Sequence, residues 1–213
     1  MLGLVLVPGV QAARPLPRVV EVPSRPAFVR PPGRSEQTAA VGQLLPGSSL
    51  LRTQRPGRLQ VLLAQGRSFR LGGDAVMRLT PSGLDLERGQ LIAWVEPGAQ
   101  GREPLRVRTR VGTASIEGTT VFLEVDDTAV TVFSWEGQVR FSPNPAGGEG
   151  LPAVVLRSGE QVAYREGAWL PPRRLGREEV MQRRRRSLLL NGFSAPMATL
   201  PVIERELGLL NPP

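Results

Sequence analysis

The sequence predicts an all-β protein: short strands in a rolled or solenoid-like stack, with a β-sandwich as the alternative. Side chains alternate with a period of two along residues 107–125 and again along 130–141, which is typical of half-buried strands. Six glycines recur at spacings of 24, 23, 23, 25 and 22 residues: Gly42, Gly66, Gly89, Gly112, Gly137 and Gly159. Such a period favours coils that stack on one another, although sandwiches also space their turns evenly.

The N-terminal 40 residues divide into two segments. Residues 1–13 are an apolar run that ends in Ala12 and Ala13, and they resemble the apolar region and cleavage site of a signal peptide. We therefore predict a periplasmic or secreted protein; if the run is instead a buried strand, a cytoplasmic location is the alternative. Residues 14–40 interleave prolines with arginines, which predicts an extended polyproline-type linker.

The strongest local prediction is a β-hairpin. Residues 121–125 and 130–132 flank Asp126-Asp127-Thr128, whose side chains favour a turn. Glu136-Gly137 then interrupts the chain before a third strand, and the prolines and glycines of residues 143–152 predict an inserted loop. Glu124, Asp126 and Asp127 match no calcium-loop spacing, and aspartate at a hairpin turn needs no metal, so we expect none.

The C-terminal segment, residues 171–213, is predicted to be a basic helical tail. Residues 177–192 form one helix in this prediction, with acidic residues near its start and arginines near its end, as the helix dipole favours. A second short helix is predicted from Pro201. The run Arg183, Arg184, Arg185 and Arg186 is a possible anion contact. Four consecutive residues cover all sides of a helix, and no aromatic residues stand between them to stack on bases. We therefore interpret the run first as solvated helix surface and second as a contact for envelope anions, and we do not expect it to bind nucleic acid.

Composition excludes several function classes. The 213 residues include no histidine and no cysteine, which excludes Ser–His and Cys–His catalysis and any thiolate metal site. All 27 basic residues are arginine and the net charge is +8, which favours acidic partners such as anionic polymer or lipid. We predict that the protein has no enzymatic activity and binds no cofactor. The enzymatic alternative is a carbohydrate-active enzyme that uses a pair of carboxylates. No stretch is long and apolar enough for a transmembrane helix.

An ordered series of short motifs extends over residues 41–169. It consists of Val41-Gly42, Pro46-Gly47 followed by residues 50–53, residues 58–62, 65–71 and 84–91, Thr109, Gly118-Thr119, the hairpin, Glu136-Gly137-Gln138-Val139, and residues 156–162 with Gly159-Glu160. This series resembles the FecR domain, the extracytoplasmic module of bacterial envelope sensors. Glu117 stands where that family usually has arginine, so the role of that arginine does not carry over.

The resemblance implies a domain over residues 41–170 whose motif residues are structural: Gly118, Thr119, Glu136, Gly137, Gly159 and Glu160. It also implies a non-catalytic sensing or interaction module that contacts a protein partner in the cell envelope. The sequence contains neither the cytoplasmic anti-sigma segment nor the membrane span of full-length regulators, so sigma-factor control is not expected. Unpaired edges of an open sheet suggest that the partner binds as an added strand.

Overall fold

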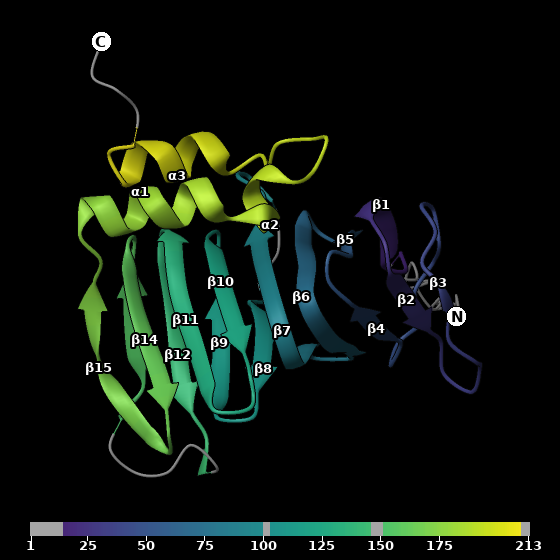
Figure 1. Ribbon diagram of the computed structural model, residues 1–213, viewed down its shortest axis with the longest axis horizontal. Coiled ribbons are helices and arrows are strands. Elements are labelled where there is room, and N and C mark those ends of the chain that lie inside the picture. Colours follow the sequence, from purple (N-terminus) through teal and green to yellow (C-terminus); the bar gives the residue numbers. More distant parts are fainter. Residues whose placement is uncertain (1–14, 100–102, 146–150, 210–213) are drawn as a thin grey trace, which may run out of the picture.

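The computed structural model describes residues 15–99, 103–145 and 151–209 (Figure 1). The strands are β1 (Arg18–Ser24), β2 (Ala27–Arg30), β3 (Gln37–Thr38), β4 (Leu50–Thr53), β5 (Arg58–Leu62), β6 (Arg67–Thr80), β7 (Gly83–Val95), β8 (Leu105–Thr109), β9 (Gly112–Ile116), β10 (Thr120–Val125), β11 (Ala129–Glu136), β12 (Gln138–Pro143), β13 (Val154–Arg157), β14 (Glu160–Arg165) and β15 (Ala168–Arg174). The helices are α1 (Arg177–Arg186), α2 (Leu188–Asn191) and α3 (Leu200–Glu206). The all-β prediction is confirmed.

All the strands belong to one open sheet, whose main path runs β13-β12-β9-β8-β7-β10-β11-β14-β15. Neighbouring strands are antiparallel except β7 and β8, which pair in parallel through Leu84 with Val107 and Asp85 with Arg108. Each residue of β8 in this pair follows its partner on β7 in the sequence by one spacing of the glycine series. Because the other pairs are antiparallel, the glycine spacing reflects a rolled sheet, and stacking of parallel coils is confined to this one pair.

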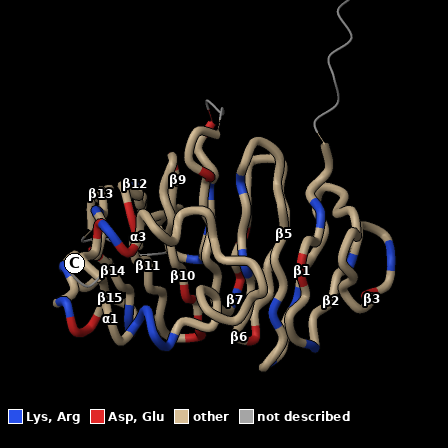
Figure 2. Tube along the Cα trace, turned by 90° about the horizontal axis from the view of Figure 1, so that it is seen from above, with Lys and Arg blue, Asp and Glu red and all other residues tan. Residues whose placement is uncertain are grey.

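The sheet rolls over at β7, so that its two ends form two layers around one core. Figure 2 shows β9, β12 and β13 on one side and β10, β11, β14 and β15 on the other. Val107, Ile116 and Phe141 from the first layer join Leu123 and Val132 from the second in a single cluster of buried side chains. Val121, Leu123 and Val125 face this core, as the period-two alternation of β10 predicts.

The predicted extended linker over residues 14–40 is wrong, because β1, β2 and β3 lie within it. β1 pairs with β5, and β2 pairs with β3 and β4. Val19, Ala27 and Val29 are fully buried and anchor these strands in the core. The prolines are tolerated because they stand between strands or, as with Pro23, beside a register shift of β1. The predicted signal segment, residues 1–13, lies outside the described residues.

The chain ends in three helices that lie across one end of the strands (Figure 1). The single helix predicted over 177–192 is wrong in one respect: it breaks at Ser187, whose backbone is extended. The Ser187 hydroxyl accepts a hydrogen bond of 3.2 Å from the Leu190 N–H and so caps α2 instead of continuing α1. The stop at Asn191-Gly192 and the second helix near Pro201 are confirmed. None of the described helices has the length and hydropathy of a membrane span.

Candidate binding groove

The outer face of the second layer carries two rows of side chains that run across the strands. Strand register places Arg70, Ile92, Phe122, Phe133 and Gln161 side by side, one from each of β6, β7, β10, β11 and β14. Most of this row is apolar, and Val180 of α1 and Leu189 and Leu190 of α2 pack against it. The helical segment therefore covers this row because burying its rings stabilises the fold.

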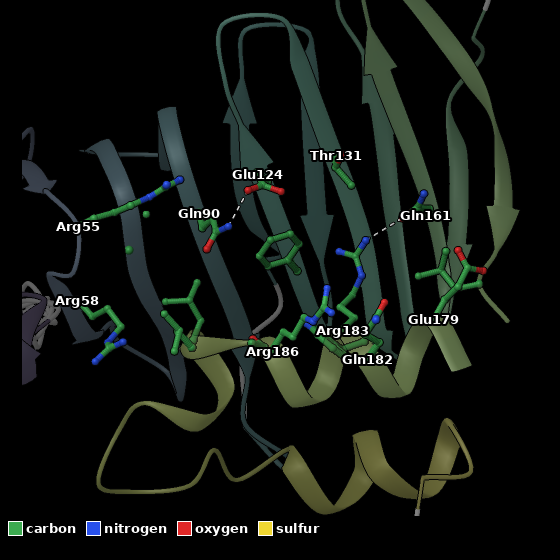
Figure 3. Close-up of a pocket in the computed structure, with 18 of the residues that line it drawn as sticks. Arg55, Arg58, Gln90, Glu124, Thr131, Gln161, Glu179, Gln182, Arg183 and Arg186 are labelled. Carbon is green, nitrogen blue, oxygen red and sulfur yellow. Dashed lines mark hydrogen bonds between the residues drawn. The ribbon is translucent and has the colours of Figure 1, made fainter. Parts of the chain in front are cut away.

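The neighbouring row on the same face has a polar, partly exposed centre and two buried ends, Gly72 and Ala163. It consists of Gly72, Gln90, Glu124, Thr131 and Ala163, again one residue from each of the five strands. The side chains of Gln90, Glu124 and Thr131 remain partly exposed. Gln90 Nε2 donates a hydrogen bond of 2.6 Å to Glu124 Oε1, which fixes both side chains on the floor (Figure 3).

An open groove of about 790 Å³ lies between this polar row and the helical segment. Figure 3 shows Arg183 and Arg186 projecting from α1 towards the strands, with Arg55 at the far end of the row. Its charged lining residues are mainly basic: Arg55, Arg58, Arg165, Arg173, Arg183 and Arg186, against Glu124 and Glu179. The groove is thus a concave surface with a positive charge and a floor of amide, hydroxyl and carboxylate groups.

The four consecutive arginines of α1 have different environments. Arg183 lies 4.7 Å from the centre of the Phe133 ring and donates a 3.1 Å hydrogen bond to Gln161 Oε1. Arg184 forms an ion pair of 2.9 Å with Glu204 of α3. Arg185 and Arg186 are exposed, and only Arg186 of these two lines the groove. The run therefore does not form one anion-binding face: its first half attaches α1 to the rest of the protein.

Burial and ion pairing perturb the charged groups around α1. Burial lowers the pKa of Arg183, an effect that the nearby Glu124 opposes. The hydrogen bonds from Arg173 and from the Gly176 N–H lower the pKa of Glu179 to about 2. The Gly176 bond, 2.9 Å long, fixes Glu179 in the first turn of α1. Glu179 therefore stays charged at neutral pH and anchors the start of the helix.

Most of the FecR-like motif residues meet at the end of the sheet, beneath α3. Thr120, beside Thr119, pairs with Glu136 across the β10–β11 ladder. The Thr120 hydroxyl lies 2.9 Å from Glu136 Oε1 and 2.8 Å from the Thr199 hydroxyl. Burial raises the pKa of Glu136, which is 4% exposed, and the nearby Glu206 raises it further. These residues connect the strands to the helical segment.

Gly137 is the most constrained residue of the motif. Its φ is +72°, and a Cβ placed on it would lie 2.6 Å from Thr119 Cγ2. Its N–H donates to Ser158 Oγ at 2.9 Å and to Glu206 Oε2 at 3.0 Å. Glycine is required here because any side chain would push apart the two motif pairs, Gly118-Thr119 and Glu136-Gly137.

Both ends of the main sheet path are poor sites for an added strand. On β13, Glu160 Oε2 accepts the Arg157 N–H at 2.8 Å, so this outward donor is already used. On β15, Pro171 and Pro172 supply no N–H at all. Gly159 links β11 to the segment just before α1, because its N–H donates to Ser134 O at 2.9 Å and its carbonyl accepts the Leu175 N–H. The geometry therefore favours the groove over these two ends of the sheet as a binding surface.

The groove could not be predicted from the sequence, because its floor combines residues from several strands that are far apart in the chain. One signal was available: Gln90-x-Ile92, Phe122-x-Glu124 and Thr131-x-Phe133 each place a polar and an apolar residue on the same strand face.

Asp126, considered as a metal ligand, instead accepts the Thr128 and Ala129 N–H groups at 2.9 and 2.7 Å and closes the hairpin turn.

Comparison with known proteins agrees with the motif series. The family model described as FecR protein matches residues 49–140. Two crystal structures from Parabacteroides distasonis ATCC 8503, at 1.65 and 2.50 Å resolution and described as a candidate anti-sigma factor, each match with 20% identity and a TM-score of 0.48. Each alignment covers 59% of this chain and 59% of that chain. No curated protein matches the sequence.

Proposed function

We propose that this protein, whose residues 49–140 match the family model described as FecR protein, is a non-catalytic interaction or sensing module that binds a protein partner in the cell envelope. The observation that carries the proposal is the groove, which runs beside α1 and has a floor of polar side chains. Its amide, hydroxyl and charged groups are suited to backbone and polar side chains of another protein. We propose the groove, in preference to the ends β13 and β15 of the main sheet path, as the surface for that partner.

The chemistry of the groove supports binding rather than catalysis. The sequence has no histidine or cysteine to act as base or nucleophile. Of the two carboxylates that line the groove, Glu124 is hydrogen-bonded by Gln90, and Glu179 is paired with Arg173 at 2.8 Å. A general acid for glycoside hydrolysis needs a raised pKa, whereas the pKa of Glu179 is lowered to about 2. The two-carboxylate alternative therefore finds no support in this groove.

The adaptor for anionic polymer or lipid is the weaker candidate. It depends on Arg183–Arg186 acting together, and Arg183 and Arg184 are already engaged with Gln161 and Glu204. Arg185 and Arg186 alone offer few contacts to a polyanion, whose binding grows with the number of phosphates or carboxylates neutralised.

The envelope location is part of the proposal, and it has its own test. FecR domains are typically extracytoplasmic, and residues 1–13 resemble the end of a signal peptide. N-terminal sequencing of protein purified from periplasmic and cytosolic fractions fixes the compartment and the mature start. Protein found only in the cytosol with Met1 intact would exclude the envelope role.

The partner itself is tested by affinity capture from envelope extract. Purified protein immobilised on beads is expected to retain a defined protein at moderate salt, and crosslinking followed by mass spectrometry should place the contacts at α1 and the outer face of β7, β10 and β11. Capture of polysaccharide or lipid without protein, abolished by salt, would instead support the anionic-polymer adaptor.

A further inference from the structure

We propose that the groove binds an acidic peptide segment of the partner, in extended form, lying across β6, β7, β10, β11 and β14. This inference rests on the proposed function and specifies the chemistry of its binding site. Three features of the groove support it: free guanidinium groups, a length that spans five strands, and one carboxylate on the floor.

The positive charge of the groove is only partly neutralised within the protein. Arg55 pairs with Asp74 at 3.2 Å and Arg173 with Glu179 at 2.8 Å. Arg165 and Arg186 line the groove, are exposed, and form no ion pair with the residues that the structure describes. Arg165 comes from β14 and Arg186 from the end of α1, so they approach the opening from the sheet and from the helix. Carboxylates of a ligand are the natural partners of two such free guanidinium groups.

The length of the groove fits a short extended peptide. The groove spans five strands, because its lining runs from Gly72 on β6 to Arg165 on β14, and strands lie about 4.8 Å apart, which gives a length of about 19 Å. An extended chain advances by about 3.3 Å per residue, so about six residues fill the groove. The row is parallel to α1 in Figure 3, which makes the helix one wall of a peptide-sized channel.

Glu124 distinguishes a peptide from a dense polyanion. Its Oε1 accepts a hydrogen bond from Gln90, while its Oε2 has no hydrogen-bond donor among the residues of the described ranges. A carboxylate at the centre of the floor repels a uniformly negative polymer, because like charges placed together are destabilising. A peptide supplies N–H groups that Glu124 can accept and acidic side chains that reach Arg165 and Arg186. A groove lined by free arginines and one carboxylate therefore favours a peptide, which has both N–H groups and acidic side chains.

The experiment uses two fluorescein-labelled dodecapeptides, (Asp-Ser)₆ and (Asn-Ser)₆, and fluorescence anisotropy with the whole protein at 50 and 200 mM salt. The variant is Arg165→Gln with Arg186→Gln. Arg185→Gln, on the same helix but outside the groove, combined with Arg157→Gln on β13, is the matched control with the same net charge. Thermal melts establish that all three proteins are equally folded.

We expect (Asp-Ser)₆ to bind and (Asn-Ser)₆ to bind at least tenfold more weakly. The groove variant should lose at least fivefold in affinity for (Asp-Ser)₆, and the control less than twofold. Equal losses in variant and control, or no binding of (Asp-Ser)₆, would overturn the inference. So would tighter binding of alginate, a polyanion without N–H donors, than of the acidic peptide.

The envelope capture described above separates this inference from the proposed function. If the groove variant still captures the protein partner, the acidic-peptide site is wrong and the interaction function stands. If the unaltered protein captures no partner, the function itself fails.

Discussion

Arg70 on β6 donates a hydrogen bond of 2.6 Å to the backbone carbonyl of Ala195, 125 positions later in the chain. The same guanidinium donates to Leu189 O at 2.9 Å and to Gln60 Oε1 at 2.8 Å, and lies 4.1 Å from the centre of the Phe193 ring. Burial lowers the pKa of Arg70 to about 10, so it remains charged at neutral pH. A buried cation therefore joins the C-terminal segment to the sheet mainly through carbonyl oxygens.

Replacing Arg70 by methionine should lower the free energy of unfolding by about 3 kcal/mol, because buried carbonyls lose their donor. Urea denaturation followed by tryptophan fluorescence measures the change. Arg78→Gln is the matched control on the same strand: its ion pair with Glu87 is exposed and 3.5 Å long, and exposed pairs contribute about 0–1 kcal/mol. Equal effects of the two substitutions would contradict the role assigned to Arg70.

A chain that ends at Leu175 should not fold into a stable sheet, although it contains every strand. Its outer face would expose Ile92, Trp94, Phe122, Phe133 and Trp135, which the helices bury. We expect strong binding of the dye ANS and loss of a cooperative urea transition. A truncated chain that unfolds at the same urea concentration as the full chain would show instead that the helices are dispensable.

Gly137→Ala and Gly118→Ala form a matched pair within the FecR motif. Both glycines have positive φ, but a Cβ at Gly137 would meet Thr119 at 2.6 Å, whereas one at Gly118 meets nothing within 4 Å. Gly118→Ala should cost about 1 kcal/mol for its backbone conformation alone, and Gly137→Ala about 1–3 kcal/mol more for strain in the packed site. Thermal and urea unfolding of both variants tests this order, and the reverse order would refute it.

Because of Glu136, the protein should be more stable at mildly acidic pH than at neutral pH. Its folded pKa is raised above the ordinary value of 4.5 by burial, so the folded state binds the proton more readily than the unfolded state. Stability from this group therefore falls as pH rises from 4.5 through the folded pKa. Glu136→Gln should exceed the unaltered protein in stability at pH 7, and the difference should shrink towards pH 5.

Glu179→Gln provides the control for this pH dependence. The folded pKa of Glu179 is about 2, so its contribution is constant between pH 5 and 7 and is lost only below that window. Urea unfolding at pH 5, 6 and 7 measures both variants. A pH-independent difference between Glu136→Gln and the unaltered protein would mean that the carboxyl titrates normally.

Features that depend on local sequence were predictable. The hairpin followed from alternation on both sides of Asp126, and the start of α1 from Glu178 and Glu179. The strands β1 to β3 were missed because proline content outweighed short apolar stretches that are stabilised only by pairing with β4 and β5. These three strands form because of pairing with residues distant in the sequence, which local composition does not reveal.

The site was harder to predict than the fold for the same reason. Arg183 belongs to the most conspicuous charge run in the sequence, yet its environment depends on Phe133 of a strand more than forty positions earlier. Arg70 carries no local sign of its buried position, since its partners are carbonyl groups of the C-terminal segment. The register that aligns Gln90, Glu124 and Thr131 is likewise set by the whole sheet.

The connection from Arg70 to Ala195 also constrains the order of events during synthesis. A ribosome releases β6, β7, β10 and β11 before the segment that contains Ala195 and Ile203, both of which complete the packing of those strands. The nascent chain therefore carries an uncovered aromatic face until α3 has emerged, and exposed faces of this kind recruit holding chaperones. Stop codons or frameshifts ahead of α3 would accordingly yield chains that expose this face and are degraded rather than shortened working proteins.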